Sequence, residues 1–454
     1  MTERRAIPGR LRSGGLLVDL YQLTMGESYV REGLAEREAT FSLFFRTLPN
    51  GWGYALAAGL EDALRYLEGL RFDEDDLAYL DRTGLFGERF LDRLRSLRFG
   101  GSVRAVPEGT AVFPNEPLLE VTAPVVEAQI AETMVLNELH LQTIIASKAA
   151  RSVDAAGGRM LVDFALRRTH GGEAGVKVAR ASYLAGFDST SNVLAGRLYG
   201  IPIAGTMAHS YIESFGSELD AFRAFARAYP DNAILLVDTY DTLEGTRRAV
   251  TVARELADGG HRLRGVRLDS GDLVELSKGV RAILDEAGFE DAMVFASGGL
   301  DEHRIAELLA AGSPIGGFGV GSKMGVSADA PFLDMAYKLV ELDGRPVLKL
   351  SEDKATLPGR KQVWRAREGD VAAYDVLGLE DGSAEGEPLL REVMRDGRVT
   401  WSEPLEGSRE RARREREMLP ESVRLLQAAS YEVRIDPELE TLRRRVGEDA
   451  RLVR

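Results

Sequence analysis

The chain has 454 residues, of which 44% are hydrophobic, and it carries a formal net charge of −14 with no cysteine. This length exceeds the usual size of one domain, so two or three domains with a large core are expected. The acidic balance argues against a nucleic-acid or anionic-membrane surface, so an anionic substrate needs a local basic pocket. The lack of cysteine excludes disulfides, thiolate catalysis and cysteine-ligated zinc, and it agrees with a reducing compartment.

Membrane and export signals are missing from the sequence pattern. No apolar run approaches the ~20 residues that a membrane-spanning helix needs. The segment from Met1 to Arg5 is not followed by the apolar core of a secretory signal. We therefore expect a cytoplasmic protein with no membrane partner and no nucleic-acid partner.

The first 124 residues predict an α+β domain. Residues 40–45 are strand-like, residues 56–70 have helical periodicity, and residues 103–121 are β-rich pieces broken by proline and glycine. A long helix is predicted from Val125 to Arg151, because Pro124 stands near its N-terminus, where a missing N–H costs little. We expect this helix to connect two domains.

Short apolar strands recur between residues 159 and 321, with helical segments between them. The predicted strands are residues 159–164, 201–204, 234–237, 263–268, 293–296 and 315–320. This alternation is typical of β/α units, and it fits either a β/α barrel or a doubly wound open sheet. Residues 340–403 are strand-rich again.

The C-terminal residues 406–454 are charged and are predicted to be helical. The run from Arg409 to Arg416 mixes charges of both signs. Such a mixture indicates a solvent-exposed helix face.

A histidine follows the predicted strand at residues 201–204, within the segment GTMAHS at 205–210. In parallel β/α proteins the C-terminal ends of the strands carry the chemistry, so His209 is a candidate nucleophile or acid/base group. The alternative is a hydrogen-bonded structural histidine.

Carboxylates and an arginine follow other predicted strands. Asp238, Arg267 and Asp269 stand at strand ends, and such a set at one barrel mouth can bind Mg²⁺ and anions together. Asp272 and Asp301 have a second interpretation as helix N-caps.

Two glycine-rich segments offer backbone N–H groups to a phosphate. The first contains Gly298 and Gly299, and the second contains Gly319, Gly321 and Ser322. Unpaired N–H groups in such turns and at helix N-termini attract anions. The alternative is that these glycines serve only to reverse the chain.

Eight segments in one order carry a resemblance to a known family. They are DLYQLTM at 19–25, FALRR at 164–168, GFDSTSN at 186–192, GTMAHS at 205–210, VDTYD at 237–241, VRLDSGD at 266–272, GVGSK at 319–323, and KLS to PGRKQV between 349 and 363. Over nearly the whole chain they resemble the nicotinate phosphoribosyltransferase family, whose members join nicotinate to phosphoribosyl pyrophosphate and consume ATP through a phosphohistidine.

The resemblance implies the fold that the strand pattern leaves open. It implies an irregular β/α barrel of the type II phosphoribosyltransferase kind at residues 125–339. It also implies an α+β N-terminal domain, residues 1–124, that is completed by the strand-rich part of a C-terminal segment, residues 340–454.

The resemblance also implies roles for individual residues. His209 is the residue that ATP phosphorylates, and Tyr21, Thr206 and Arg267 match the residues that hold the acceptor base. Phe164 and Arg167 are further candidates for the pocket wall, with core packing as the alternative for Phe164. From their strand-end and turn positions we add Asp238 and Asp269 as catalytic residues and Gly298, Gly299, Gly319, Gly321 and Ser322 as substrate-binding residues. The family commonly has threonine where this chain has Ser322, a change that keeps the hydroxyl.

Cofactors and partners follow from the same resemblance. Mg²⁺ is the implied cofactor and ATP the implied co-substrate, in a pathway of NAD biosynthesis. In the family the tyrosine matching Tyr21 comes from a neighbouring subunit, which implies a homodimer with shared active sites. Ser191 stands where enzymes that take nicotinamide have an aspartate, and this favours the acid over the amide.

Other functions remain open. Quinolinate phosphoribosyltransferase needs a pocket for two carboxylates and no ATP, a nicotinamide-specific enzyme is a closer alternative, and a non-catalytic relative or an aldolase-like metal enzyme would belong to other classes. The segment 351–365, with Lys354, Arg360 and Lys361, either closes over nucleotide phosphates or forms a solvated hairpin.

Overall fold

The computed structural model describes residues 14–350 and 356–452. The chain divides into two compact units, of which unit 1 contains Met1–Ser147 and Phe332–Arg454, and unit 2 contains Lys148–Pro331. The first division falls inside the long helix α5 (Val125–Ala156), so these bounds differ from the domain bounds predicted at residues 124 and 339. A helix that continues through the division has no proline or glycine there to mark it.

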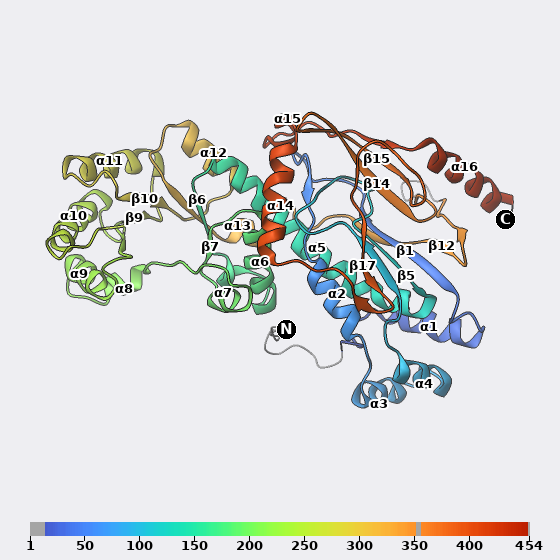
Figure 1. The fold of residues 1–454 in the computed structure, drawn as a ribbon. Coiled ribbons are helices and arrows are strands. Elements are labelled where there is room, and N and C mark those ends of the chain that lie inside the picture. The colour runs from blue at the N-terminus through green and yellow to red at the C-terminus, as the bar shows by residue number, and fades with distance from the viewer. Residues whose placement is uncertain (1–13, 351–355, 453–454) are drawn as a thin grey trace. The chain divides into compact units, whose positions relative to one another are not determined.

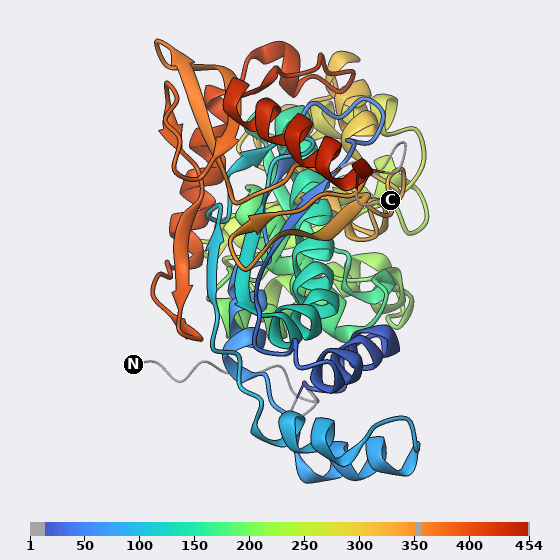
Figure 2. The same cartoon turned by 90° about the vertical axis from the view of Figure 1, so that its right-hand side faces the viewer.

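A seven-stranded antiparallel sheet forms the centre of unit 1 (Figure 1, Figure 2). Its strand order is β13-β12-β1-β5-β3-β17-β18. The strands are β1 (Glu38–Phe45), β3 (Ser102–Ala105), β5 (Leu119–Pro124), β12 (Met335–Leu342), β13 (Arg345–Pro346), β17 (Arg391–Arg395) and β18 (Arg398–Val399). Because β12 pairs with β1 and β17 with β3, the C-terminal segment completes the N-terminal sheet, which confirms the expectation.

The sheet of unit 1 is covered by α5, and the sequence shows why. Seven of the eight residues of β1 are buried, so this strand lies in the core. Its sequence is accordingly mostly apolar, as is typical of a strand that is covered on both faces. Phe41 stacks on Tyr337 of β12 with ring centroids 4.8 Å apart, and the Tyr337 hydroxyl donates to the carbonyl of Ala128 in α5 at 2.9 Å. These contacts fix the long helix against the sheet.

Four helices precede β5 in the chain. They are α1 (Leu20–Arg31), α2 (Leu60–Gly69), α3 (Glu74–Arg82) and α4 (Glu88–Ser96). The helix predicted over 56–70 is present, but it begins at Leu60. Leu56 belongs instead to the short strand β2 (Ala55–Leu56), which pairs with β4 (Ala111–Val112). Gly59, with a φ of 98°, separates that strand from the helix.

A second sheet in unit 1 has the order β16-β14-β15-β19. Its strands are β14 (Lys361–Glu368), β15 (Val371–Leu379), β16 (Glu387–Pro388) and β19 (Val433–Ile435), and the helices near it are α14 (Leu405–Met418), α15 (Glu421–Arg424) and α16 (Pro437–Leu452). The prediction of a purely solvated face for residues 409–416 is wrong. Ala412 and Glu415 are buried on this helix. Glu415 accepts a hydrogen bond from Arg365 of β14, so this face of α14 packs against the sheet.

Unit 2 contains a six-stranded sheet whose pairings are all parallel, with the order β7-β6-β11-β10-β9-β8 (Figure 1). Its strands are β6 (Met160–Asp163), β7 (Ser189–Thr190), β8 (Ile234–Leu236), β9 (Gly265–Leu268), β10 (Met293–Ala296) and β11 (Gly317–Val320). The sheet is a curled half-barrel with β7 and β8 at its edges, which confirms the irregular β/α barrel and five of the six predicted strands.

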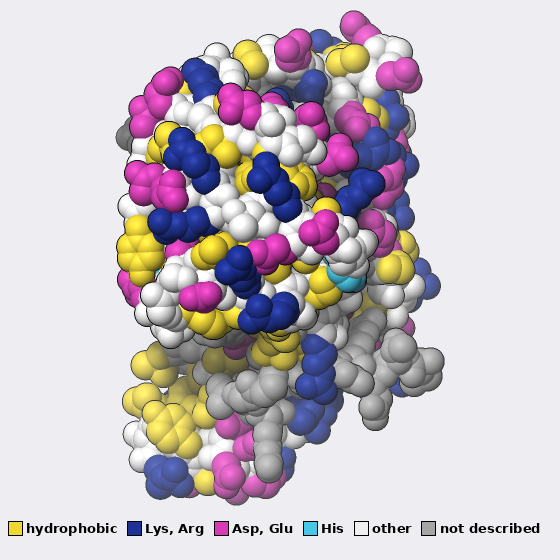
Figure 3. Space-filling model, turned by 90° about the vertical axis from the view of Figure 1, so that its left-hand side faces the viewer, with side chains coloured by type: hydrophobic (Ala, Val, Ile, Leu, Met, Phe, Trp, Pro, Cys, Tyr) yellow, Lys and Arg dark blue, Asp and Glu magenta, His cyan; other side chains and the backbone are white. Residues whose placement is uncertain are grey.

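Helices connect these parallel strands, as β/α units require. They are α6 (Gly172–Ala185), α7 (Val193–Tyr199), α8 (His209–Glu213), α9 (Glu218–Ala228), α10 (Thr242–Asp258), α11 (Leu273–Glu286), α12 (Glu302–Ala310) and α13 (Ser322–Gly325), with a 3₁₀ turn at Leu166–Arg168. On the face that carries α9, α10 and α11, basic and acidic side chains are interspersed (Figure 3).

The predicted strand at residues 201–204 is wrong. Asn192 caps α7, Gly200 ends this helix in the left-handed conformation with a φ of 73°, and Ile203 makes only a single bridge to Thr190. Pro202 has no N–H for a ladder, so the apolar run cannot continue as a strand. The strand that does occupy this edge, β7, has only two residues and is polar, which is why the sequence did not indicate it.

No helix in the described part of the chain is both long enough and apolar enough to span a membrane. The longest helix, α5, carries charged residues along its length.

Candidate active site

A hollow of about 340 Å³ opens at the C-terminal ends of β6, β9, β10 and β11 in unit 2. Because the strands are parallel, these ends meet at one edge of the sheet and bring distant segments together. The residues that line it are Phe164, Arg167, Arg168, Arg267, Asp269, Ser297, Gly298, Gly299, Leu300, Gly319, Gly321, Ser322 and Lys323. Nine of them are residues that the sequence predicted for the site. Four cations against one carboxylate make this lining basic, as an anionic substrate requires in an acidic chain.

Arg267, on β9, is held in a fixed orientation. Its Nε donates to Ser297 Oγ at 2.8 Å, one Nη donates to Thr206 Oγ1 at 3.1 Å, and the other donates to Asp269 Oδ1 at 2.6 Å. The guanidinium also lies 5.4 Å from the centre of the Phe164 ring. A planar cation that is fixed on an aromatic wall is suited to hold a flat anionic ring.

Two aspartates lie side by side at the ends of β8 and β9. Oδ2 of Asp238 accepts from the backbone N–H of Asp269 at 2.9 Å and from the hydroxyl of Ser270 at 2.6 Å. Its Oδ1 is buried and has no hydrogen-bond partner among the described residues. Burial opposes ionisation of Asp269, but hydrogen bonds from Ser297 and Arg267 outweigh it and hold the pKa of Asp269 below its ordinary value. Asp269 is therefore ionised at neutral pH.

The glycine turn after β10 brings open backbone to the hollow. Gly298 has a φ of 92°, and a Cβ there would lie 1.9 Å from the carbonyl oxygen of Asp269. Gly299 has a φ of 65° and open space in front of it. The turn leads into α12, whose N-cap Asp301 accepts from the backbone of Arg304 at 2.8 Å. A phosphate can approach this turn because no side chain covers it.

Asp272 and Asp301, for which the sequence left helix capping as an alternative interpretation, act as N-caps. Asp272 accepts from the backbone N–H groups of Val274 and Glu275 at the start of α11, and it does not line the hollow. Asp301 caps α12 and also accepts from Lys323 Nζ at 2.7 Å. The helix-capping interpretation therefore describes both.

Two cations at the hollow were not among the predicted site residues. Arg168 donates to Ser322 Oγ at 3.2 Å, and Lys323 reaches Asp301. Their positions beside Arg167 and Ser322 in two quoted motifs were a signal for them. Gly319 admits the ring of Phe164, because a Cβ there would lie 2.5 Å from it, whereas Gly321 faces the backbone carbonyl of Phe164, which a Cβ would approach to 3.1 Å.

His209 begins α8 rather than ending a strand. Its Nδ1 is 3.1 Å from Thr239 Oγ1, in the loop after β8. The imidazole is close enough to Asp269 to favour ionisation of that carboxylate. His209 is half-buried and does not line the hollow itself, so it lies beside the Asp238 and Asp269 pair.

The remaining predicted residues have different surroundings. Thr206 contacts Arg267, Arg167 is exposed on the hollow, and Ser191 donates its backbone N–H to the carbonyl of Asp163 at 2.8 Å, without lining the hollow. Tyr21 belongs to unit 1, on α1, where 46% of it is exposed.

The segment 351–365 is not a basic flap in its described part. Lys361 is buried with its Nζ 3.2 Å from Glu120, and Arg360 pairs with Glu380 at 2.7 Å. Both are therefore engaged within unit 1, while Ser351 and Lys354 lie outside the described residues.

A curled parallel β/α sheet with a basic hollow and an open glycine turn at its C-terminal edge defines a β/α enzyme class that binds phosphorylated, anionic substrates. Comparison with known proteins makes the assignment narrower. Residues 16–140 match the nicotinate phosphoribosyltransferase N-terminal domain, and residues 160–368 match the nicotinate phosphoribosyltransferase family. The chain belongs to the nicotinate phosphoribosyltransferase family.

Individual relatives agree with this assignment. The chain is 52% identical over 449 residues to nicotinate phosphoribosyltransferase pncB2 of Mycobacterium tuberculosis, covering 98% of this chain and 95% of that protein. It is 46% identical over 375 residues to the enzyme of Bacillus subtilis, covering 79% of this chain and 76% of that protein. The crystal structure of human nicotinic acid phosphoribosyltransferase superposes with a TM-score of 0.85 at 32% identity, covering 95% of this chain and 100% of that one.

Proposed function

We propose that this protein transfers the phosphoribosyl group of phosphoribosyl pyrophosphate to nicotinate, giving nicotinate mononucleotide and pyrophosphate. The nitrogen of nicotinate forms the new bond to C1 of the ribosyl group, and the bond from C1 to pyrophosphate breaks with its electron pair leaving on pyrophosphate. The relatives named above support the reaction class. The observation that carries it in this chain is the fixed Arg267, which faces a basic hollow with Phe164 as its aromatic wall.

The residues divide the two substrates between them. Arg267 and Phe164 suit the carboxylate and the ring of nicotinate, since Ser297, Thr206, Met207 and Asp269 occupy four of the five guanidinium N–H groups and leave one for a charge-assisted hydrogen bond to the carboxylate. The glycine turn at Gly298 and Gly299, with Lys323 at the same hollow, suits the phosphates of the donor. Fixing both substrates at one edge of the sheet lowers the barrier chiefly by orientation and charge stabilisation.

Mg²⁺ fits the residues near this edge. The orphaned Oδ1 of Asp238 and the ionised Asp269 are oxygen ligands of the kind that Mg²⁺ uses, and this ion commonly takes one or two carboxylates plus substrate phosphates. When bound, the ion supplies charge neutralisation for the departing pyrophosphate. A second acidic cluster, Glu302 with its neighbours, is less suited, because Lys148 and Arg151 already neutralise Glu302.

ATP hydrolysis is assigned to His209. In this proposal the free imidazole nitrogen attacks the terminal phosphorus of ATP, the bond to ADP breaks, and water later releases phosphate from the histidine. Since Nδ1 contacts Thr239, Nε2 is the nitrogen available for phosphorylation. The phosphohistidine couples ATP hydrolysis to synthesis of the mononucleotide.

The first test is an assay of purified protein with phosphoribosyl pyrophosphate and Mg²⁺, offered nicotinate, nicotinamide or quinolinate, with and without ATP. Nicotinate mononucleotide as the main product, raised by ATP with release of ADP, is the expected result. His209→Asn is expected to keep basal synthesis and lose the ATP-stimulated part. Product from nicotinamide or quinolinate alone would contradict the substrate, and an unchanged ATP response of His209→Asn would contradict the role of the histidine.

A homodimer with shared sites is the proposed assembly. Tyr21 and its neighbour Leu20 are exposed on α1, where an aromatic ring can reach a partner's hollow. The test mixes two inactive variants, Tyr21→Ala and Arg267→Ala, after unfolding and refolding together. If sites are shared, each heterodimer has one intact site, and activity returns to about a quarter of the wild-type value. No recovery at all would contradict shared sites.

A further inference from the structure

A second basic hollow lies in unit 1, far along the chain from the residues proposed for the reaction. It has a volume of about 180 Å³, and its wall is formed by β14, β16, β17 and the helix α14. Five arginines line it: Arg365, Arg367, Arg391, Arg411 and Arg414. Only two carboxylates, Glu387 and Glu415, share that lining. In a chain with a net charge of −14, this local excess of positive charge needs an explanation.

Partners within the protein satisfy only three of these arginines. Arg365 forms the floor, where Asp375 and Glu415 bind it at 2.6 and 2.5 Å. Arg367 pairs with Glu387 at 2.8 Å, and Arg411 pairs with Glu403. Arg391 and Arg414 have no hydrogen bond or ion pair with a carboxylate among the described residues. Both are exposed, so their charges are available to a ligand.

Two of these arginines, Arg391 and Arg411, are held against the ring of Trp401. Arg391 lies 5.1 Å and Arg411 5.9 Å from the ring centre of Trp401. Arg411 and Arg414 also stand three residues apart on α14, which places them on one face of the helix. Fixed guanidinium groups bind phosphate with less loss of side-chain entropy than mobile ones.

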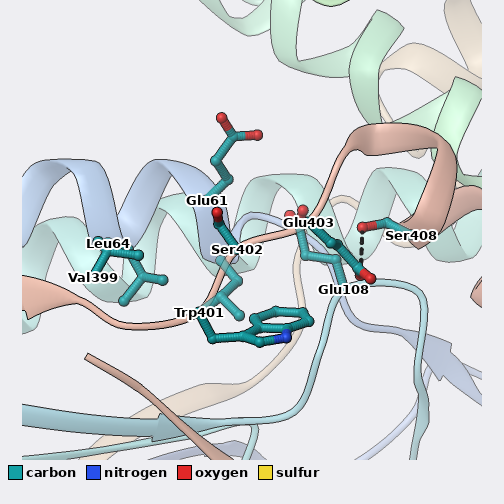
Figure 4. Close-up of a pocket in the computed structure, with 9 residues that line it drawn as sticks. Glu61, Leu64, Glu108, Val399, Trp401, Ser402, Glu403 and Ser408 are labelled. Carbon is teal, nitrogen blue, oxygen red and sulfur yellow. Dashed lines mark hydrogen bonds between the residues drawn. The ribbon is translucent and has the colours of Figure 1, made fainter. Parts of the chain in front are cut away.

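Trp401 also lines a neighbouring, smaller hollow that has the opposite charge (Figure 4). That hollow contains Glu61, Glu108 and Glu403, and Glu403 accepts a hydrogen bond from Ser408 at 3.0 Å. Acidic side chains are therefore gathered in one hollow and arginines in the other. An anion is expected only in the arginine-lined hollow.

We propose that the arginine-lined hollow of unit 1 binds a diphosphate group, either as free inorganic pyrophosphate or as part of a nucleotide. Guanidinium groups bind phosphate oxygens through paired, charge-assisted hydrogen bonds, and two free arginines match two phosphoryl groups. The volume of about 180 Å³ is more than ten times the ~10–15 Å³ that a single water needs, which leaves room for a diphosphate.

The test isolates this hollow from the site in unit 2. Full-length protein with Arg168→Gln and Lys323→Gln serves as the background, so that binding of anions to the proposed active site is weakened. Binding of pyrophosphate, ATP and AMP is then measured by calorimetry without Mg²⁺, before and after adding Arg391→Gln and Arg414→Gln. A control variant carries Arg413→Gln, which removes one charge from the same helix but does not line the hollow.

Pyrophosphate or ATP binding in the background protein, at least tenfold weaker after Arg391→Gln and Arg414→Gln and unchanged by Arg413→Gln, is the expected result. Equal affinity for pyrophosphate and ATP would identify the diphosphate alone as the ligand group, while tighter ATP binding would identify a nucleotide. No binding of either anion, or equal weakening by Arg413→Gln, would overturn the proposal. Fluorescence of Trp401 gives a second readout, because a ligand on Arg391 and Arg411 changes the surroundings of this indole, and a Trp401→Phe variant should lose that signal.

Discussion

Two buried or half-buried arginines, one in each unit, make the same kinds of contact with opposite consequences. Arg365 in unit 1 and Arg267 in unit 2 each bind a carboxylate, and each lies 5.4 Å from the centre of a phenylalanine ring. The side chain of Arg365 is 1% exposed, whereas that of Arg267 is 13% exposed and borders the hollow. Arg365 lies at the floor of the arginine-lined hollow, but two buried carboxylates bind its guanidinium, so it stabilises the fold. Arg267 borders the hollow of unit 2 and can serve a substrate.

The largest effect is expected from Arg365→Leu. The change leaves Asp375 and Glu415 buried without their cation, beside the already buried Glu116. Removing one partner of a buried ion pair costs about 3–5 kcal/mol of unfolding free energy. Chemical denaturation measures this loss, while the activity per folded molecule should stay unchanged. Arg413→Leu, at an exposed ion pair on α14, is the control and should leave the free energy of unfolding nearly unchanged. A similar loss in both variants would contradict the comparison.

Arg267→Lys should have the opposite effect to Arg365→Leu, lowering the activity and leaving the stability nearly unchanged. Lysine keeps the charge but cannot donate to Ser297, Thr206 and Asp269 at once, so the cation loses its fixed orientation at the hollow. We expect kcat/KM for nicotinate to fall about 30- to 100-fold, or about 2–2.7 kcal/mol, with a loss of stability below about 1 kcal/mol. Arg264→Lys, at an exposed position before β9, should leave both values unchanged. A large loss of stability without a loss of kcat/KM would show that Arg267 is structural.

Gly298→Ala tests whether the open glycine turn matters by its shape. A Cβ at Gly298 meets the carbonyl of Asp269, so the turn must move, whereas a Cβ at Gly299 meets open space. Both positions have positive φ, so both variants carry the same kind of backbone strain of about 1 kcal/mol. We expect KM for phosphoribosyl pyrophosphate to rise about tenfold for Gly298→Ala and at most a few-fold for Gly299→Ala. Equal changes in KM for the two variants would show that the shape of the turn does not determine binding of phosphoribosyl pyrophosphate.

The smallest effect is a difference in the pH dependence of the two regions. Burial, together with repulsion by Asp375, raises the pKa of Glu116 well above its ordinary value. Its contribution to stability is therefore present below the unfolded-state pKa and is lost as the pH rises through the folded-state pKa. Asp269 has a lowered pKa, so its contribution is present above the unfolded-state pKa and is lost only as the pH falls through the folded-state pKa.

Glu116→Gln separates these contributions. The variant should remove the fall in stability between weakly acidic and neutral pH and leave the loss at strongly acidic pH, as measured by denaturation across the pH range. If the slope between weakly acidic and neutral pH is the same in both proteins, Glu116 is not its cause.

The sequence predicted the strands of unit 2 well where they were apolar runs of at least three residues. Residues 293–296 are such a run and match β10 at both ends. The sequence did not indicate the edge strand β7, because a polar strand of two residues gives no pattern. It wrongly predicted a strand at residues 201–204, where Gly200 and Pro202 interrupt the apolar run. Burial alone cannot distinguish a strand from an extended loop.

The site was predictable where a strand end fixes the residue. Arg267, Asp269 and Gly298 follow directly from strand positions, and they do line one hollow. Arg168 and Lys323 lie inside two of the quoted motifs, but their contacts with Ser322 and Asp301 depend on the approach of separate loops, which the spacing of the sequence does not report. The arginine-lined hollow of unit 1 was missed for a similar reason. Its arginines come from β14, from β17 of the other sheet and from α14, and the helical part alone looks like an ordinary charged surface.

The sheet of unit 1 is completed late during synthesis, because its strands come from both ends of the chain. Its strands β1, β3 and β5 precede residue 125, but β12 and β17 come after residue 334, on the far side of the whole of unit 2. On a ribosome the contiguous residues 148–331 can fold as soon as they emerge, while β1 and β3 must wait with unpaired edges for partners about 300 residues later. Truncations before β17 should therefore leave a folded unit 2 attached to an aggregation-prone unit 1, and folding of the whole chain should be slow because these pairings are so distant.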